Sequence, residues 1–302
     1  MARFARTAGR VAEGAIREKL TPGVGRKEAA ELGNIASYGT ARTYSDALKG
    51  FVAWRQEQGV PLGDALTWDV KAAAEQYLKV RAESGLSQKT LDKDRQSIEC
   101  AVGAKFDRVK VDDPAPKESR YISREQAKMV AGAMTPHNAL ATEVAREAGL
   151  RACELATIRP IGEQPPDQRP WEKNRFDGRD NWVRYSVIGK GGLIREVRLE
   201  PDLAAKLEAT RMAEPQKVMD RDIAREKHYA IGHGQAWSQA FTEAARRALG
   251  WSPGAHGCRH GFAQDRMREH QRDHLKGREE AQRAVSQELG HFDPDTTTTY
   301  LR

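Results

Sequence analysis

The sequence predicts a mainly α-helical protein of two domains, with a small β-hairpin in the second domain. Apolar residues recur with helical spacing through residues 36–110, and a polar segment containing two prolines follows at 111–119. Farther along, apolar and polar residues alternate on both sides of the turn Gly189–Gly192, as they do in paired strands. A length of 302 residues is enough for two ordinary domains. We therefore expect a helical domain at 36–110, a linker at 111–119 and an α+β domain at 120–302.

The first domain is expected to be a bundle of three helices. The first helix carries apolar residues at positions i, i+4, i+7 and i+8, namely Tyr44, Leu48, Phe51 and Val52. Thr67 and Ser87 have hydroxyl side chains suited to capping the next two helices, and Gly85 is placed to end the second one. The charged residues fall on the opposite faces, which is typical of a small soluble bundle.

Residues 1–35 are expected to form a basic N-terminal arm. The first 30 residues contain seven lysines and arginines and three glutamates. Their large apolar side chains, Phe4, Val11 and Ile16, are too sparse to predict an amphipathic helix. A solvated tail is the expected structure, and contact with nucleic-acid phosphates is the alternative.

In the second domain, helices are interrupted by a single β-hairpin. Ser123 is suited to cap a helix that begins at Arg124, and the polar region 161–181 is expected to be a loop. The strands are predicted by two alternating runs, Val183, Tyr185, Val187 and Leu193, Arg195, Val197, Leu199. Helices are expected to resume at Pro201. The highly charged stretch 265–283 is expected to form a solvated helix, with an inter-subunit contact as the alternative.

Composition excludes several classes of protein. The net charge of +7 favours a polyanionic partner, which fits nucleic acid, an anionic membrane surface or simply a basic soluble protein. No apolar run approaches the roughly 20 residues that cross a bilayer, and no secretory signal is recognisable, so we expect a cytoplasmic protein without a membrane partner. The three separated cysteines form no CxxC pair and indicate reduced thiols. Neither a nucleotide-binding glycine loop nor a carboxylate cluster for a metal is present, so no cofactor is expected.

Six residues form a chemically complete set for breaking a phosphodiester without a metal: Arg151, Lys190, His256, Arg259, His291 and Tyr300. Attack on phosphorus places extra negative charge on the nonbridging oxygens, which the planar fork of arginine neutralises well. A tyrosine hydroxyl can act as the nucleophile, a histidine can take its proton, and a lysine of lowered pKa can protonate the leaving oxygen.

Each of these residues has an ordinary structural interpretation when taken alone. Arg151 is placed to pair with Glu154 three residues on, and Lys190 is a typical solvated turn lysine. His256 and Arg259 fit an exposed helical pair, Tyr300 fits a ring packed on the core, and His291 fits a helix-cap histidine after a glycine. Only their combination favours the catalytic interpretation.

In this order and context, the motifs resemble those of the tyrosine recombinase (phage integrase) family. The similarity rests on four matches: G-L-R-x-x-E-L at Gly149–Leu155, a hairpin lysine at Lys190, H-x-x-R-H-x-F-A at His256–Ala263, and L-G-H at Leu289–His291 followed by Tyr300. The resemblance covers most of the chain, with 36–110 similar to the helical core-binding domain and 120–302 similar to the catalytic domain. The early motifs are weak singly, whereas their ordered conjunction is specific.

The resemblance implies a DNA strand exchange through a 3′-phosphotyrosine. Tyr300 would attack one strand, and Arg151, Arg259 and His291 would hold the phosphate. Lys190 would act as general acid, and His256 would assist proton transfer. No metal or other cofactor is implied. The implied partners are double-stranded DNA at specific recombination sites, three further copies of the chain in a homotetramer, and accessory DNA-bending or directionality proteins.

Two alternatives remain beside this interpretation: a catalytically silent DNA-binding protein of the same fold, and a type IB topoisomerase-like enzyme. The basic arm favours a mobile-element integrase among recombinases. Only Leu301 and Arg302 follow Tyr300, whereas family members commonly carry a longer tail that packs on a neighbouring subunit, so assembly is expected to differ here. In the first domain, Lys89, Lys93 and Arg95 are expected to contact DNA phosphates.

Overall fold

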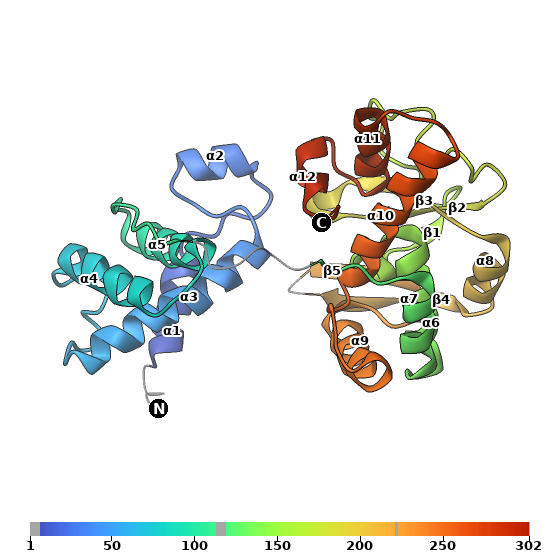
Figure 1. Cartoon of the computed structure of the whole chain (residues 1–302). Helices are drawn as coiled ribbons and strands as arrows, with labels where there is room; N and C mark the ends of the chain where they lie inside the picture. The colour runs from blue at the N-terminus through green and yellow to red at the C-terminus, as the bar shows by residue number, and fades with distance from the viewer. Residues whose placement is uncertain (1–6, 113–118, 221–222, 302) are drawn as a thin grey trace. The chain divides into compact units, whose positions relative to one another are not determined.

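The computed structural model describes residues 7–112, 119–220 and 223–301, without the side chains of Arg26 and Lys190. The chain divides into two compact units, Met1–Pro116 and Lys117–Arg302 (Figure 1). Each unit has its own hydrophobic core. The division falls within the segment 111–119 that the two prolines marked as a linker.

The regular elements in the described part of the first unit are helices, apart from an isolated bridge between Leu20 and Ile35. Its helices are α1 (Ala8–Arg17), α2 (Arg26–Glu31), α3 (Tyr38–Glu57), α4 (Val70–Glu83) and α5 (Gln88–Val102). Helix α3 is central, because α1, α4 and α5 all pack against it. Its apolar face buries Leu48, Phe51 and Val52, as the helical spacing predicted.

The helix starts were predicted with mixed success. Ser87 caps α5 by accepting a hydrogen bond from the backbone N–H of Thr90. The prediction that Thr67 caps the second helix was wrong, because α4 begins three residues later, after Asp69. Asp69 has a left-handed backbone with φ of 43°, which breaks the chain direction before the helix.

The N-terminal segment corrects a second expectation. Residues 8–17 form helix α1, which packs on α3 and buries Ala12 and Ile16 completely. This segment is therefore part of the first core and not a solvated arm. Its apolar stripe consists mostly of alanines, which a search for large apolar side chains overlooks, yet alanine is the best helix former and allows close helix packing.

The second unit places a small antiparallel sheet among helices. Its elements are α6 (Arg124–Gly132), α7 (Pro136–Ala148), the 3-10 turn η1 (Glu154–Ala156), β1 (Arg159–Pro160), β2 (Val183–Ile188), the turn η2 (Lys190–Gly192), β3 (Ile194–Leu199), α8 (Pro201–Glu208), β4 (Arg211–Asp220), β5 (Ile223–Tyr229), α9 (Gly234–Leu249), α10 (Gly257–Arg272), α11 (Arg278–Glu288) and α12 (Pro294–Thr298). Ser123 caps α6 in a capping box with Gln126, as expected. The strand order is β1-β2-β3, with Tyr185 opposite Val197.

The core of this unit is built around α7, which packs against β3, α6 and α9. Val144 of α7, Val187 of β2 and Phe241 of α9 are fully buried there. The hairpin and the loop at 161–181 were both predicted correctly from the sequence. The same core fixes the ends of α7 and β3, which carry residues of the candidate site.

A second hairpin, β4–β5, was not predicted. Most of its side chains are exposed, including Met219, which is 67% accessible. Because neither face is fully buried, the strands lack the clean alternation of apolar and polar residues by which strands are found. Helices do resume at Pro201, but only for the eight residues of α8.

The charged stretch 265–283 is not a solvated helix. Helix α10 ends at Arg272, α11 begins at Arg278, and Arg266 and His270 are both buried. Arg266 Nε lies 2.9 Å from Glu288 Oε1 on α11. Buried charges are tolerated when they are paired, and a partner on another helix gives no signal in the local charge pattern.

Candidate active site

The first arginine, Arg151, is positioned by the end of helix α7. Gly149 ends this helix with a φ of 61°, and a Cβ at this residue would lie only 2.5 Å from the ring of Phe262. Glycine is therefore required there for both the backbone conformation and the space. The turn buries Leu150 and places Arg151 at the start of the segment that leads into η1.

The second arginine and its histidine come from the start of helix α10. His256 immediately precedes the helix and Arg259 lies on its first turn. Arg259 is fully buried, and its guanidinium donates hydrogen bonds to the carbonyl oxygens of Gly149, at 2.5 Å, and Leu289. Burial and the neighbouring Arg151 lower its pKa to about 9, so the group remains charged at neutral pH.

Tyr300 lies just after α12 and is 8% exposed. Its hydroxyl oxygen is 3.2 Å from Nε2 of His256. The guanidinium carbon of Arg259 lies 5.3 Å from the centre of its ring. The ring also packs in a hydrophobic cluster with residues of α10 and α11. Tyr300 is therefore both a core residue and a candidate nucleophile.

A buried carboxylate, Glu154, holds the cationic groups together. It lies 2.6 Å from Arg151 Nη1, 2.8 Å from Arg195 Nη2 and 3.8 Å from Arg259 Nη1. Burial alone would raise the pKa of Glu154, but Arg195, Arg259 and Arg151 outweigh it and hold that pKa well below its ordinary value. The group is thus a carboxylate that fixes three arginines around one centre.

His291 contacts both arginines of the site. Its Nε2 lies 2.9 Å from Arg151 Nη2 and 3.3 Å from Arg259 Nη2, and its Nδ1 lies 3.2 Å from Thr297 Oγ1. Burial, followed by the charges of Arg259 and Arg151, lowers the pKa of His291 to about 3. Burial, followed by the charges of Arg259 and His260, lowers the pKa of His256 to about 4, so both imidazoles are neutral at pH 7. A neutral His256 is able to take a proton from Tyr300.

A pocket of about 400 Å³ lies beside this cluster and is lined by part of it. Arg151, Arg195, His291 and Tyr300 line it, together with Gly189 of the β2–β3 turn. Lys190 follows Gly189 directly, but its side chain lies outside the part of the chain that the structure describes. Of the six predicted catalytic residues, the structure therefore brings together the five whose side chains it describes.

Sequence reasoning missed two residues of this site. Arg195 is 1% exposed and joins Glu154 to the end of α11 by donating to the carbonyl oxygen of Glu288. Thr297 is fully buried beside His291. The signal for Arg195 was available, because it occupies an inward position in the alternating run of β3, where an unpaired charge would be unfavourable.

The predicted DNA-contacting residues on α5 separate into two groups. Lys89 and Lys93 are four residues apart and share one face of the helix, and no described residue forms an ion pair with either. Arg95 lies on another face and pairs with Glu99 at 2.6 Å. Among the described residues, Arg95 is therefore paired with a carboxylate, whereas the two lysines are not.

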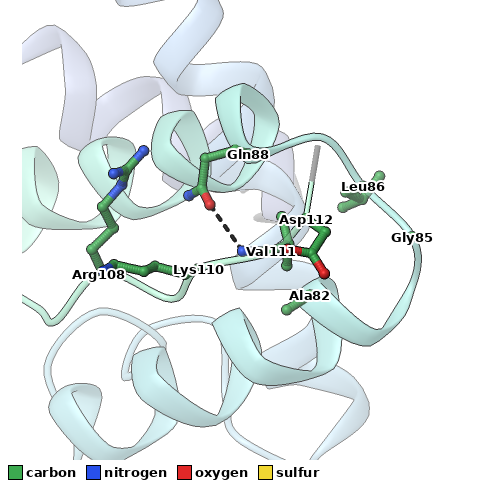
Figure 2. A pocket seen from close by; sticks show the side chains of 8 residues that line it. All are labelled: Ala82, Gly85, Leu86, Gln88, Arg108, Lys110, Val111 and Asp112. Carbon is green, nitrogen blue, oxygen red and sulfur yellow. Dashed lines mark hydrogen bonds between the residues drawn. The ribbon is translucent and has the colours of Figure 1, made fainter. Parts of the chain in front are cut away.

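A larger pocket, of about 780 Å³, lies in the first unit and contains none of the candidate catalytic residues (Figure 2). Gln88 at the start of α5 accepts a hydrogen bond from the N–H of Val111 at 2.9 Å and donates to the carbonyl of Val109 at 3.0 Å. Arg108 on its rim is already held by both carboxylate oxygens of Asp92. The pocket thus marks where the chain leaves the helical unit.

The sequence matches no protein-family model and no curated protein, but the structure matches solved structures over nearly its whole length. The XerH site-specific recombinase bound to palindromic difH substrate, a post-cleavage complex, is similar with a TM-score of 0.55 and 15% identity, covering 98% of this chain and 90% of that one. A pre-cleavage complex of XerH with difH gives a TM-score of 0.54 and 17% identity, covering 97% and 91%. The Tn1549 transposon integrase with circular intermediate DNA gives 0.51 and 15%, covering 99% and 96%.

The chain has the fold of the tyrosine recombinases. The mainly helical architecture with small antiparallel sheets, expected from the sequence, is thereby confirmed. No group of histidine, cysteine and acidic side chains suited to a metal ion occurs among the described residues. Within the same residues, no helix is long and apolar enough to cross a bilayer.

Proposed function

We propose that the protein is a site-specific DNA recombinase that cuts and rejoins DNA through a 3′-phosphotyrosine intermediate. The observation that carries this proposal is the position of the Tyr300 hydroxyl, 3.2 Å from a neutral His256 and beside the buried Arg259. A phenol in this setting has a base for its proton and fixed positive charge for the phosphate that it attacks.

The first step transfers one DNA strand to the protein. Arg151 and Arg259 neutralise the nonbridging oxygens of the scissile phosphate, and His291 adds a third contact. His256 takes the proton as Tyr300 Oη bonds to phosphorus, while the bond to the 5′ oxygen breaks. Lys190 is the proposed donor of the proton that leaves with the 5′ hydroxyl.

The second step reverses the first with a different strand. A 5′ hydroxyl from a partner duplex attacks the phosphotyrosine, and the phenol of Tyr300 recovers its proton. The number of phosphodiester bonds is unchanged, so the exchange proceeds without hydrolysis. Exchange between two duplexes requires several protomers, and we propose a homotetramer on double-stranded DNA, with accessory DNA-bending proteins as further partners.

The proposal covers recombination and makes no choice among integration, resolution and inversion. A basic N-terminal arm was the support for a mobile-element integrase. Residues 8–17 form a helix packed into the first core, so only part of this segment can act as a free arm. Of its basic residues, Arg3 and Arg6 lie outside the described part of the chain.

The proposal is tested with labelled DNA from the protein's own replicon, in EDTA, on a denaturing gel. We expect a covalent protein–DNA adduct with the wild type and none with Tyr300→Phe. Transfer of label between two duplexes then separates a recombinase from a topoisomerase-like enzyme, which rejoins only within one duplex. DNA binding at native sites without any adduct would contradict the proposed reaction and favour a silent binding protein.

The faces of α5 lead to a separate prediction about DNA affinity. Replacing both Lys89 and Lys93 by glutamine is expected to reduce the slope of log affinity against log salt by about 2, because each phosphate contact releases counterions. Arg95→Gln, the matched control, is expected to change the slope by less than 0.5 because Glu99 already neutralises it. Fluorescence anisotropy across a salt series measures both, and equal slopes for the double variant and the wild type would exclude this face.

A further inference from the structure

The hydrogen bonds around His291 fix which ring nitrogen carries the proton. Nε2 faces a guanidinium nitrogen of Arg151 at 2.9 Å and one of Arg259 at 3.3 Å. A guanidinium only donates hydrogen bonds, so Nε2 must accept. A neutral imidazole that accepts at Nε2 carries its proton on Nδ1, which then donates to Thr297 Oγ1 at 3.2 Å.

This arrangement conflicts with the role of His291 in the proposed reaction, on which the present inference rests. To hold a nonbridging phosphate oxygen, Nε2 must donate a hydrogen bond and therefore carry the proton. When a phosphate enters the pocket, its oxygens are the better acceptors for Arg151 and Arg259. Nε2 then loses the two donors that required it to accept.

We propose that phosphate binding moves the ring proton of His291 from Nδ1 to Nε2, and that Thr297 is the positioning residue that supports both forms. Water takes the proton from Nδ1 and supplies one to Nε2, so the imidazole is neutral in both forms and no net proton is gained or lost. The hydroxyl of Thr297 accepts from Nδ1–H in the free protein and donates to the bare Nδ1 in the phosphate-bound protein. A hydroxyl does both by rotating its hydrogen, whereas a carboxylate or an ammonium offers only one of these functions.

Thr297 also contacts the backbone of the proposed nucleophile. The residue is fully buried on α12, and its carbonyl oxygen accepts a hydrogen bond from the backbone N–H of Tyr300 at 2.8 Å. The same residue therefore fixes the ring of His291 and the backbone of the nucleophile. Helix α12, which precedes Tyr300, is thus connected through Thr297 to His291, the residue proposed to bind the phosphate.

The tautomer is measured directly by NMR of protein labelled with ¹⁵N in the histidine rings, with His291→Asn used to assign the signals. In the free protein we expect a protonated Nδ1, and with inorganic phosphate added we expect the proton at Nε2. A free protein with the proton on Nε2, or a tautomer unchanged at the highest phosphate concentration, would overturn the switch.

Two variants test the role of Thr297 in the reaction. Thr297→Val keeps the shape but removes the hydroxyl, and we expect adduct formation to slow about tenfold, the effect of one lost hydrogen bond. Thr297→Ser keeps the hydroxyl and is expected to stay within about threefold of the wild type. Thermal unfolding of both variants shows whether each is folded at the assay temperature.

The outcomes separate this inference from the proposed function. If the wild type forms the adduct and Thr297→Val forms it equally fast, the role of Thr297 is wrong and the recombinase proposal stands. If Thr297→Ser is as slow as Thr297→Val, the hydroxyl is not the group that matters, and the inference fails. If the wild type forms no adduct, the proposed reaction fails, while the tautomer of free His291 is still decided by NMR.

Discussion

Replacing Glu154 by glutamine is expected to lower the free energy of unfolding of the second unit by about 3–5 kcal/mol, the usual effect of removing one partner from a buried ion pair. The substitution keeps the shape of the side chain but removes the charge that faces Arg151, Arg195 and Arg259. The positive charges then repel one another at a fully buried position. Urea unfolding followed by tryptophan fluorescence measures the change, because Trp237 lies in the core of this unit.

The matched control is Glu226→Gln, which also removes a carboxylate paired with an arginine. Glu226 pairs with Arg159 at 2.9 Å, but its side chain is 53% exposed, so the expected loss is below about 0.5 kcal/mol. Equal losses for the two variants would show that Glu154 does not organise the arginines.

Glu154 also makes the free energy of unfolding of the second unit depend on pH. Because the pKa of Glu154 in the folded protein lies below its ordinary value of 4.5, its contribution is complete above pH 4.5 and is lost as the pH falls toward the folded-state pKa. The difference in stability between wild type and Glu154→Gln is therefore expected to shrink below pH 4.5. A difference that grows on acidification would contradict the assigned charge state.

The second large effect is expected at Arg151. The side chain of Arg151 is 22% exposed and lines the pocket. Arg151→Gln therefore removes a fixed cation with little loss of packing. We expect the rate of adduct formation to fall by about 10²–10³, as when one preorganised donor is removed from a transition-state site. Single-turnover adduct formation measures the rate at saturating protein.

Arg151→Lys distinguishes geometry from charge alone. Lysine keeps the charge but lacks the planar fork that bonds Glu154 through Nη1 and reaches His291 through Nη2. We expect it to recover less than about a tenth of the lost rate. Recovery to the wild-type rate would mean that charge alone is sufficient at this position.

Much of the fold could be predicted because its signals are local. The spacing of apolar residues placed α3, Ser87 and Ser123 marked two helix starts, and alternation placed β2 and β3. Helix α1 and the hairpin β4–β5 were missed, since the first uses alanines for its apolar face and the second buries neither face fully.

The candidate site, too, could be predicted from the sequence only in part. The motifs identified the residues that would contact a phosphate, but they did not show what holds those residues. Glu154 was recognised only as a neighbour of Arg151, whereas in the structure it also binds Arg195, 41 residues away in the chain. Thr297 gave no signal at all, because its partner and its burial depend on how α12 folds back beside His291.

The most direct test of the account is to identify the bond in the protein–DNA adduct by mass spectrometry. Trypsin releases residues 284–302 as one peptide, in which Tyr300 is the single tyrosine. We predict that this peptide carries a nucleotide linked through its 3′ phosphate to Tyr300, and that the other DNA end is a free 5′ hydroxyl. A nucleotide on another peptide, or a 5′-phosphate link, would contradict the assignment of Tyr300 as the nucleophile of a recombinase.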